Sequence, residues 1–283
     1  MILYGSEVSL KIKHGLKKKI DKIISNNKRL PKLAVVLVGD NPASLSYIKG
    51  KRKACEEVGI LFDLRTLDKS STSKDVIDTI ELLNSDESVD GILVQLPLPK
   101  GLDEKDILEH IDPNKDVDGL TAINAGKLFL GEKTYVPCTP LGIMVLLEEA
   151  GVDLCGKNVV VIGRSNLVGL PVSRLLIASN ATVTLCHSKT KDLKGVASKA
   201  DILIVAIGKD RFIDDKYVKD GAVVIDVGIN RIDGKLYGDV DFNKVKDKAS
   251  VITPVPKGVG PMTIAMLLHN VINAYEVKND REL

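Results

Sequence analysis

The sequence of 283 residues contains no tryptophan, and aromatic residues make up only 4% of it. A flat ring ligand would find few side chains to stack on, so every tyrosine is a possible ligand contact. Histidine and cysteine are also scarce, with four of each. The cysteines lie far apart, without the paired spacing of a zinc site, so we expect no metal centre and reduced thiols, as in a cytoplasmic protein. They are Cys55, Cys138, Cys155 and Cys186.

An excess of one charge and long apolar runs are absent too. The 40 basic and 38 acidic residues leave a net charge of +2, which gives no reason to expect nucleic acid or a membrane surface as a partner. No apolar run approaches the roughly 20 residues of a membrane span, and the first residues lack the basic and apolar regions of a signal peptide. The length fits one large or two medium domains with substantial cores.

The first half of the chain alternates apolar strands with amphipathic helices. The run from Leu33 to Asp40 predicts a buried strand. Asn41 and Pro42 then predict the N-cap and first turn of a helix, and Gly59 predicts its end. This alternation is typical of a parallel sheet covered by helices. The other elements expected here are helices over 8–23 and 73–84 and strands over 62–67 and 91–96.

The second half begins with a strand, a glycine turn and a helix. Val159 to Ile162 predict a buried strand, and Gly163 ends it before a helical pattern. Backbone N–H groups and the positive end of the helix dipole would then face outward, which suits a phosphate group. The spacing from Gly163 through Ser165 to Gly169 departs from the usual Gly-x-Gly-x-x-Gly, so an ordinary strand–helix turn is also possible.

The next strand ends in His187, Ser188 and Lys189, about twenty residues after the glycine turn. An NAD site carries an acid at this point to bind the ribose 2′-hydroxyl, and here there is none. These residues and Arg164 offer hydrogen-bond donors and positive charge instead, so we favour NADP over NAD. A solvated surface cluster is the alternative.

Further strands are expected over 201–206, 222–227 and 250–252, and a last helix begins near Pro261. The segment 97–136 is rich in proline, glycine and aspartate and is the least regular. We therefore predict two α/β domains with a cleft between them, the second of Rossmann type. The expected boundaries are 1–138, joined by a C-terminal helix over 262–283, and 139–261.

Three polar side chains are expected where strands of the first half end. Tyr47 and Lys51 are four residues apart on one helix and share a face. Such pairs are common on helix surfaces, but this helix follows the carboxyl end of a parallel strand, where open α/β sheets bind ligands. Gln95 closes another strand and needs a polar partner, for which Lys51 is a candidate.

Two further segments carry candidate contacts. Asp116 and Asp118 lie in an Asp-Val-Asp-Gly sequence, which is compatible with plain turn chemistry as well as with binding. The loop over 253–263 is dense in proline and glycine and opens the last helix. It predicts either a ligand-contacting loop or a domain hinge.

Six motifs occur in a fixed order along the chain. They are Val38–Ser44 with Tyr47 and Lys51, Gln95–Pro99, Lys115–Gly119, Pro137–Pro140, Gly163–Ser165 with Val168–Pro171, and Thr253–Thr263. As a set they resemble the bifunctional methylenetetrahydrofolate dehydrogenase/methenyltetrahydrofolate cyclohydrolase family, over essentially the whole chain. One departure is Lys257, where the family usually has glycine. A positive φ angle there would strain a lysine.

The resemblance implies oxidation of 5,10-methylenetetrahydrofolate by NADP, followed by hydrolysis of the methenyl product to 10-formyltetrahydrofolate. It makes 1–138 the catalytic, folate-binding domain and 139–261 the NADP-binding domain, and it implies a homodimer. The catalytic residues that it implies are Lys51, Tyr47 and Gln95. Substrate binding is expected at Tyr47, Asp118 and Pro261, and cofactor binding at Gly163, Arg164, Ser165, Gly169, His187, Ser188 and Ile229.

Lysine suits the hydrolytic step, because the attacking water must lose a proton and burial beside a cationic substrate lowers a lysine pKa. Three alternatives stand beside this interpretation: an NADP-dependent dehydrogenase similar to shikimate dehydrogenase, a catalytically silent nucleotide-binding regulator, and a family member with one activity. The first does not account for Tyr47 together with Gln95–Pro99. Lys51 favours retained cyclohydrolase activity, and Arg164 favours the NADP-linked dehydrogenase.

Overall fold

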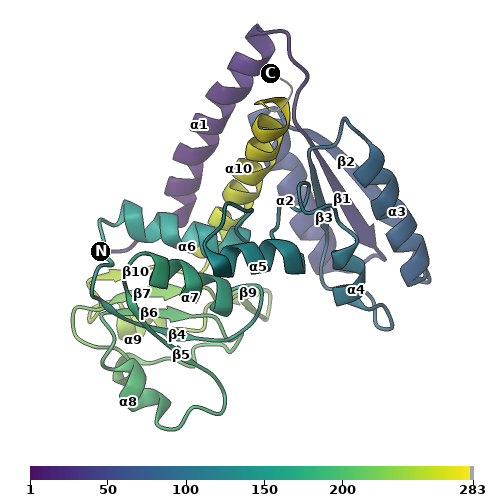
Figure 1. Cartoon of the computed structure of the whole chain (residues 1–283). Coiled ribbons are helices and arrows are strands. Elements are labelled where there is room, and N and C mark those ends of the chain that lie inside the picture. Colours follow the sequence, from purple (N-terminus) through teal and green to yellow (C-terminus); the bar gives the residue numbers. More distant parts are fainter. Residues whose placement is uncertain (281–283) are drawn as a thin grey trace. The chain divides into compact units, whose positions relative to one another are not determined.

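The structure, a computed structural model, describes residues 1–280 and divides into two compact units (Figure 1). The three-stranded unit consists of Lys11–Cys138 and the chain from Ile264 onward. The five-stranded unit consists of Met1–Leu10 and Thr139–Thr263. Both are α/β units built on parallel sheets, as predicted. The last three residues of the helix predicted over 262–283 lie outside the described residues.

The sheet of the three-stranded unit has the order β2-β1-β3, with all neighbours parallel. Its central strand β1 is an almost fully buried apolar run, as the sequence predicts. The helix that follows β1 is capped as expected, because the Asn41 side chain accepts a hydrogen bond from the Ala43 amide at 2.9 Å. The elements are β1 (Lys32–Val38), α2 (Pro42–Val58), β2 (Leu61–Leu67), α3 (Ser73–Ser85) and β3 (Gly91–Val94).

The segment 97–136 holds two helices that the sequence did not predict. They are α4 (Glu104–Glu109) and α5 (Ala122–Leu130). Asp103 and Thr121 cap them with side-chain oxygens, so their ends are defined by local chemistry. Six and nine residues are too few to show a helical period above the surrounding proline and glycine.

The first and last helices of the chain are long: α1 (Gly5–Ser25), drawn in purple in Figure 1, and α10 (Val259–Asp280), drawn in yellow. Within the three-stranded unit, Lys19 on α1 binds Glu276 on α10 at 2.9 Å. The core on one side of this sheet is formed by β1, β3, α3 and α4. Its fully buried members include Ala34, Val36, Val76, Ile80, Ile92 and Ile107.

The five-stranded unit has the strand order β10-β7-β6-β4-β5, all parallel, which is a Rossmann-type arrangement. Its predicted strands are all present. A short antiparallel hairpin, β8–β9, was not predicted, because its two strands of three residues each are mostly exposed. The elements are α6 (Cys138–Glu149), β4 (Asn158–Ile162), α7 (Gly169–Ala178), β5 (Thr182–Cys186), α8 (Leu193–Ala197), β6 (Ile202–Val205), η1 (Asp215–Tyr217), β7 (Val223–Asp226), β8 (Asn230–Ile232), β9 (Lys235–Tyr237), α9 (Phe242–Val245) and β10 (Val251–Ile252).

Parallel strands bring their carboxyl ends to one edge of each sheet. In the three-stranded unit the segment after β3 begins with Gln95, and the loop after β1 leads into α2. In the five-stranded unit β4 leads into Gly163 and β5 into His187. Gln95, Gly163 and His187 therefore lie at these edges, as does the start of the helix that carries Tyr47 and Lys51. Among residues 1–280, no helix is both long enough and apolar enough to cross a bilayer.

Candidate active site

Lys51 lies on α2 with its amine directed at the end of β3. Its Nζ donates a hydrogen bond to Oε1 of Gln95 at 2.9 Å. Gln95 is buried, and its Nε2 donates to the carbonyl of Leu96 at 2.7 Å. The Gln95 amide is thus fixed with its oxygen toward the lysine, which is the contact expected from the sequence.

Asp118 is the principal negative charge acting on this lysine. Burial lowers the pKa of Lys51, while Asp118 opposes that change and raises it. Burial likewise raises the pKa of the Asp118 carboxyl, with the Lys51 charge acting in the opposite direction. Both side chains keep some exposed surface, so a ligand can reach them. Burial and the mutual charge interaction therefore act in opposite directions on the pKa of each member of this pair.

The two acids of the Asp-Val-Asp-Gly sequence have different roles. Asp116 is buried and accepts hydrogen bonds from the amide and hydroxyl of Thr121 at 2.9 and 2.8 Å and from the Asn124 side chain at 2.9 Å. It is the structural acid of the turn, so the turn-chemistry alternative holds for Asp116. Asp118 instead interacts electrostatically with Lys51 and hydrogen-bonds to Cys138.

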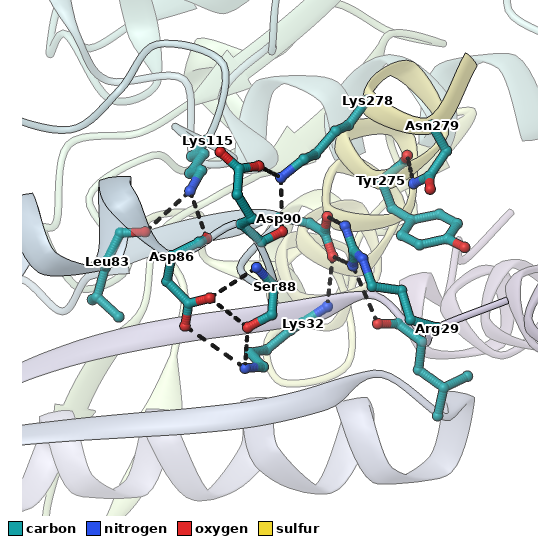
Figure 2. A network of polar contacts seen from close by, with 12 residues as sticks. Arg29, Lys32, Leu83, Asp86, Ser88, Asp90, Lys115, Tyr275, Lys278 and Asn279 are labelled. Atoms are coloured by element: carbon teal, nitrogen blue, oxygen red, sulfur yellow. Dashed lines mark hydrogen bonds and ion pairs between the residues drawn. The ribbon is translucent and has the colours of Figure 1, made fainter. Parts of the chain in front are cut away.

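The segment before Asp118 is anchored to helix α3 by Lys115. The Lys115 Nζ donates to the carbonyls of Leu83 and Asp86 at 3.1 and 2.9 Å (Figure 2). It also donates to the carbonyl of Asn84 at 2.6 Å. These carbonyls belong to the last turn of α3 and to the residue after it, where a cation is favourable. Lys115 is therefore a helix cap and not a free positive charge.

Figure 2 also shows how α10 is attached to the same unit. Arg29 forms two hydrogen bonds of 2.7 Å with Asp90, whose side chain is fully buried. The Arg29 guanidinium lies 5.0 Å from the ring centroid of Tyr275 on α10. This bidentate pair and the ring contact fix the later turns of α10 near the start of β3, the strand that leads into Gln95.

Two residues that the sequence did not single out contact the Asp118 segment. Asn270 on α10 is buried, and its Nδ2 donates to the carbonyls of Val117 at 2.8 Å and Val136 at 3.0 Å. The Cys138 thiol hydrogen-bonds to the Val117 carbonyl at 3.6 Å and also to Asp118. Burial raises the pKa of Cys138 well above its usual range, so it remains a donor. An asparagine in an otherwise apolar helix face was the available signal.

Tyr47 lies on α2 in the turn preceding Lys51, as the spacing predicts. Its side chain is 48% exposed. A large aromatic side chain left this open beside a buried lysine is available to stack on a flat ligand.

In the five-stranded unit, the loop between β4 and α7 requires glycine at both predicted positions. Gly163 has φ = +122°, and a Cβ there would lie 2.1 Å from the carbonyl oxygen of Ala206. A Cβ on Gly169 would lie 2.0 Å from the Gly163 carbonyl oxygen. Arg164 and Ser165 are exposed at the tip of the loop, before the N-terminus of α7. This close-packed backbone and open helix N-terminus fit the phosphates of a dinucleotide.

The end of β5 carries donors and no acid. The Nδ1 atom of His187 accepts a hydrogen bond from the Lys189 amide at 3.1 Å, which assigns the ring proton to Nε2. Ser188 is exposed beside it. The arrangement supplies N–H and O–H donors at the place where an NAD site has its acid.

Ile229 and Pro261 complete the predicted set in this unit. Ile229 follows β7 and is 44% exposed. Its Cδ1 lies close to Gly260, at 3.6 Å from the position that a Cβ on this glycine would occupy. Pro261 lies in the first turn of α10. Lys257, just before that helix, has φ = +80°. The structure thus groups Tyr47, Lys51, Gln95 and Asp118 in the three-stranded unit, and the other site residues in the five-stranded unit.

A glycine loop at the carboxyl edge of a Rossmann-type sheet, in a chain that also holds a partly buried Lys–Gln–Asp cluster, defines a dinucleotide-dependent α/β enzyme. Residues 137–279 match the family model described as "Tetrahydrofolate dehydrogenase/cyclohydrolase, NAD(P)-binding domain". Residues 3–118 match that of the "Tetrahydrofolate dehydrogenase/cyclohydrolase, catalytic domain". The chain belongs to the tetrahydrofolate dehydrogenase/cyclohydrolase family.

Individual relatives resemble the chain over its whole length. The bifunctional protein FolD of Halalkalibacterium halodurans is 52% identical over 274 residues, covering 97% of this chain and 98% of the relative. The crystal structure of FolD from Campylobacter jejuni has a TM-score of 0.96 and 49% identity, covering 98% and 99%. FolD from Trypanosoma brucei, in complex with NADP cofactor and an inhibitor, has a TM-score of 0.94 and 35% identity, covering 98% of each chain.

These findings confirm the predicted family, the two α/β parts and the paired dehydrogenase and cyclohydrolase activities, and they agree with NADP as cofactor. The shikimate dehydrogenase alternative is not favoured. The structure of that enzyme from Thermus thermophilus is only 14% identical, with a TM-score of 0.53, covering 87% of this chain and 100% of its own. That likeness shows a shared fold alone.

Proposed function

We propose that Lys51 is the acid/base residue of the cyclohydrolase reaction and that the loop at Gly163 binds NADP for the dehydrogenase reaction. The observation that carries the first part is the 2.9 Å contact of Lys51 with Gln95 beside Asp118. The second part is supported by Gly163 and Gly169, because any side chain at these two positions would place its Cβ against a backbone oxygen.

The bound nicotinamide supplies the hydride acceptor for oxidation of 5,10-methylenetetrahydrofolate. Gly163 and Gly169 let the backbone approach the cofactor phosphates. Arg164, Ser165, His187 and Ser188 bind the 2′-phosphate and so select NADP over NAD. Arg164 can make paired hydrogen bonds to phosphate, which a neutral donor cannot match.

The hydrolytic step needs a proton acceptor near the substrate. Water attacks the methenyl carbon, and Lys51, as the free amine favoured by burial, takes the proton from that water. The bond from this carbon to the N5 ring nitrogen then breaks as the lysine returns the proton to that nitrogen, and the hydroxyl proton on the carbon's oxygen is released to solvent, giving 10-formyltetrahydrofolate and one H⁺. Gln95 holds the amine in place through its oxygen.

The remaining assignments concern substrate binding. Asp118 accepts N–H groups from the amino-pyrimidine edge of the folate, a charge-assisted contact. Tyr47 stacks on the ring system, for which its exposure leaves room. Pro261 contributes an apolar contact from the start of α10. In this proposal, residues 1–138 together with residues 262–283 form the folate-binding domain and residues 139–261 form the NADP-binding domain. The enzyme is a cytoplasmic homodimer.

The test is a two-signal spectroscopic assay. Purified protein is mixed with 5,10-methylenetetrahydrofolate and NADP⁺ or NAD⁺, and reduced nicotinamide and the methenyl compound are followed separately. We expect faster reduction with NADP⁺ and little methenyl accumulation. An equal rate with NAD⁺ would contradict the phosphate assignment, and steady methenyl accumulation would contradict the role of Lys51.

A further inference from the structure

Two buried carboxyl groups lie beneath the dinucleotide site, and the proposed chemistry uses neither. Asp239 is fully buried, and Asp226 is 3% exposed. They are packed against glycine backbone: a Cβ on Gly228 would lie 2.2 Å from Asp239, and a Cβ on Gly238 would lie 1.8 Å from Asp226. Burying two acids side by side is costly unless N–H donors surround them.

The Asp239 carboxylate binds the loop that follows β6. Its Oδ2 accepts the amides of Ile207 at 2.6 Å and Gly208 at 3.0 Å, and its Oδ1 accepts the amide of Lys209 at 2.7 Å. Three consecutive amides bound to one carboxylate fix the course of this loop. Ala206 directly precedes these three residues, and its carbonyl oxygen leaves no room for a side chain at Gly163.

The same carboxylate also binds the segment that follows β7. Nδ2 of Asn230 donates to Oδ1 of Asp239 at 3.0 Å, and Asn230 directly follows Ile229. Asp226 holds the Asp239 backbone in turn, because it accepts the amides of Asp239 at 2.9 Å and Val240 at 3.0 Å. One side chain therefore joins two loops at the carboxyl edge of the sheet.

The strand order says which half of a dinucleotide these loops face. β5 lies on one side of β4, and β6 and β7 lie on the other. The 2′-phosphate residues proposed above follow β4 and β5. A dinucleotide crosses the sheet edge at the point where the strand order reverses, so its nicotinamide half belongs over β6 and β7.

We propose that Asp239 is a positioning residue for the nicotinamide half of the cofactor. It contacts no ligand itself, and it keeps the loop 206–209 and the segment at Ile229 in their binding geometry before the cofactor arrives. The inference rests on the proposed NADP site and adds to it a group that acts through backbone amides.

Asp239→Asn tests the proposal, because asparagine has the same size but turns one acceptor oxygen into a donor facing N–H groups. The dissociation constant is measured for NADP⁺ and for adenosine 2′,5′-bisphosphate, which lacks the nicotinamide half. We expect the NADP⁺ constant to rise about 10- to 100-fold and the bisphosphate constant to stay within about twofold. Cyclohydrolase activity on the methenyl substrate without NADP⁺ should stay within about twofold as well.

Two further variants complete the test. Asp210→Asn is the matched control, since that acid is paired with the Arg211 side chain at 2.7 Å, and it should change neither constant. Asn230→Ala removes one donor to Asp239 and leaves the carboxylate intact, so we expect a smaller rise in the NADP⁺ dissociation constant. This variant keeps the proposal testable if Asp239→Asn does not fold. Equal weakening of both ligands, or an unchanged NADP⁺ constant in both variants, would overturn the proposal. Wild-type protein that fails to bind NADP⁺ would instead overturn the proposed cofactor site.

Discussion

At the scale of single residues, the active site depends on the balance between burial and charge at Lys51. Burial lowers the pKa of Lys51, and the neighbouring carboxylate of Asp118 raises it. A fully solvated lysine would hold its proton at neutral pH and could not act as a base. Without a nearby acid, burial would lower the pKa of the lysine further. Burial and the acid thus act in opposite directions on the pKa of Lys51.

Replacing Asp118 by asparagine should affect folate binding and the lysine together. We expect KM for the folate substrate to rise about 10- to 100-fold, because a charge-assisted contact is lost. The negative charge that raises the pKa of Lys51 also disappears, so the acid limb of the cyclohydrolase pH profile should move to lower pH. Steady-state kinetics across pH measure both effects. Unchanged folate KM would refute the binding role, and NADP⁺ affinity serves as the internal control.

Replacing Arg164 by alanine should narrow the preference for NADP⁺ over NAD⁺ about 10- to 100-fold, measured as the ratio of kcat/KM values. The loss should fall on NADP⁺ alone, since NAD⁺ has no 2′-phosphate for the guanidinium to bind. A ratio equal to that of the wild type would move phosphate recognition to His187 and Lys189.

Lys257 is a strained residue, because its φ of +80° suits glycine and disfavours a side chain. Lys257→Gly should therefore raise the free energy of unfolding, because glycine adopts this angle without strain. The net gain should be about 0.5–1 kcal/mol, since glycine also gives the unfolded chain more conformational entropy. Urea unfolding measures this. Lys257→Ala is the control: it removes the charge and keeps the Cβ, and so should give no such gain. Equal stabilisation by both changes would show that charge, not φ, is responsible.

At the scale of elements, the sequence predicted those whose ends carry strong local signals. The helix α2 was located by Asn41 and Gly59, which both behave as caps in the structure. The contact between Lys51 and Gln95 followed from the rule that parallel strands end at one edge. The short helices α4 and α5 and the β8–β9 hairpin were missed because elements of so few residues are too short to show a periodic spacing of apolar side chains. The Asn270 contact depends on tertiary packing of α10, and its only local signal was a polar residue in an apolar helix face.

Asp226, the last residue of β7, should make the stability of the five-stranded unit sensitive to pH. Burial raises the pKa of Asp226 to about 7, above its unfolded value of about 4. Its contribution to stability is complete below pH 4 and is lost as the pH rises through 7, because only the folded state still holds the proton between these values. The slope from this one group is at most about 1.4 kcal/mol per pH unit.

Asp226→Asn should therefore flatten the fall in unfolding free energy between pH 4 and 7 relative to wild type, whatever its effect on absolute stability. Urea unfolding at several pH values measures the two slopes. Asp220→Asn is the control, because that side chain is 91% exposed and should leave the slope unchanged. Parallel curves for wild type and Asp226→Asn would show that Asp226 does not titrate in this range.

At the scale of the whole molecule, the candidate residues for the two reactions fall in separate compact units. The lysine cluster belongs to the three-stranded unit, and the glycine loop with the side chains proposed to bind phosphate belongs to the five-stranded unit. Helix α10 contributes its first residues to one unit and the rest to the other. A change confined to one unit should therefore leave ligand binding by the other intact.

The Lys51→Met variant tests this account most directly, because methionine keeps the length of the side chain and removes its base. The variant is mixed with 5,10-methylenetetrahydrofolate and NADP⁺, and reduced nicotinamide and the methenyl compound are recorded together. The account predicts that methenyl accumulates in a one-to-one ratio with reduced nicotinamide, while the NADP⁺ dissociation constant matches that of the wild type. Methenyl hydrolysis at the wild-type rate, or equal loss of reduction, hydrolysis and NADP⁺ binding, would contradict it.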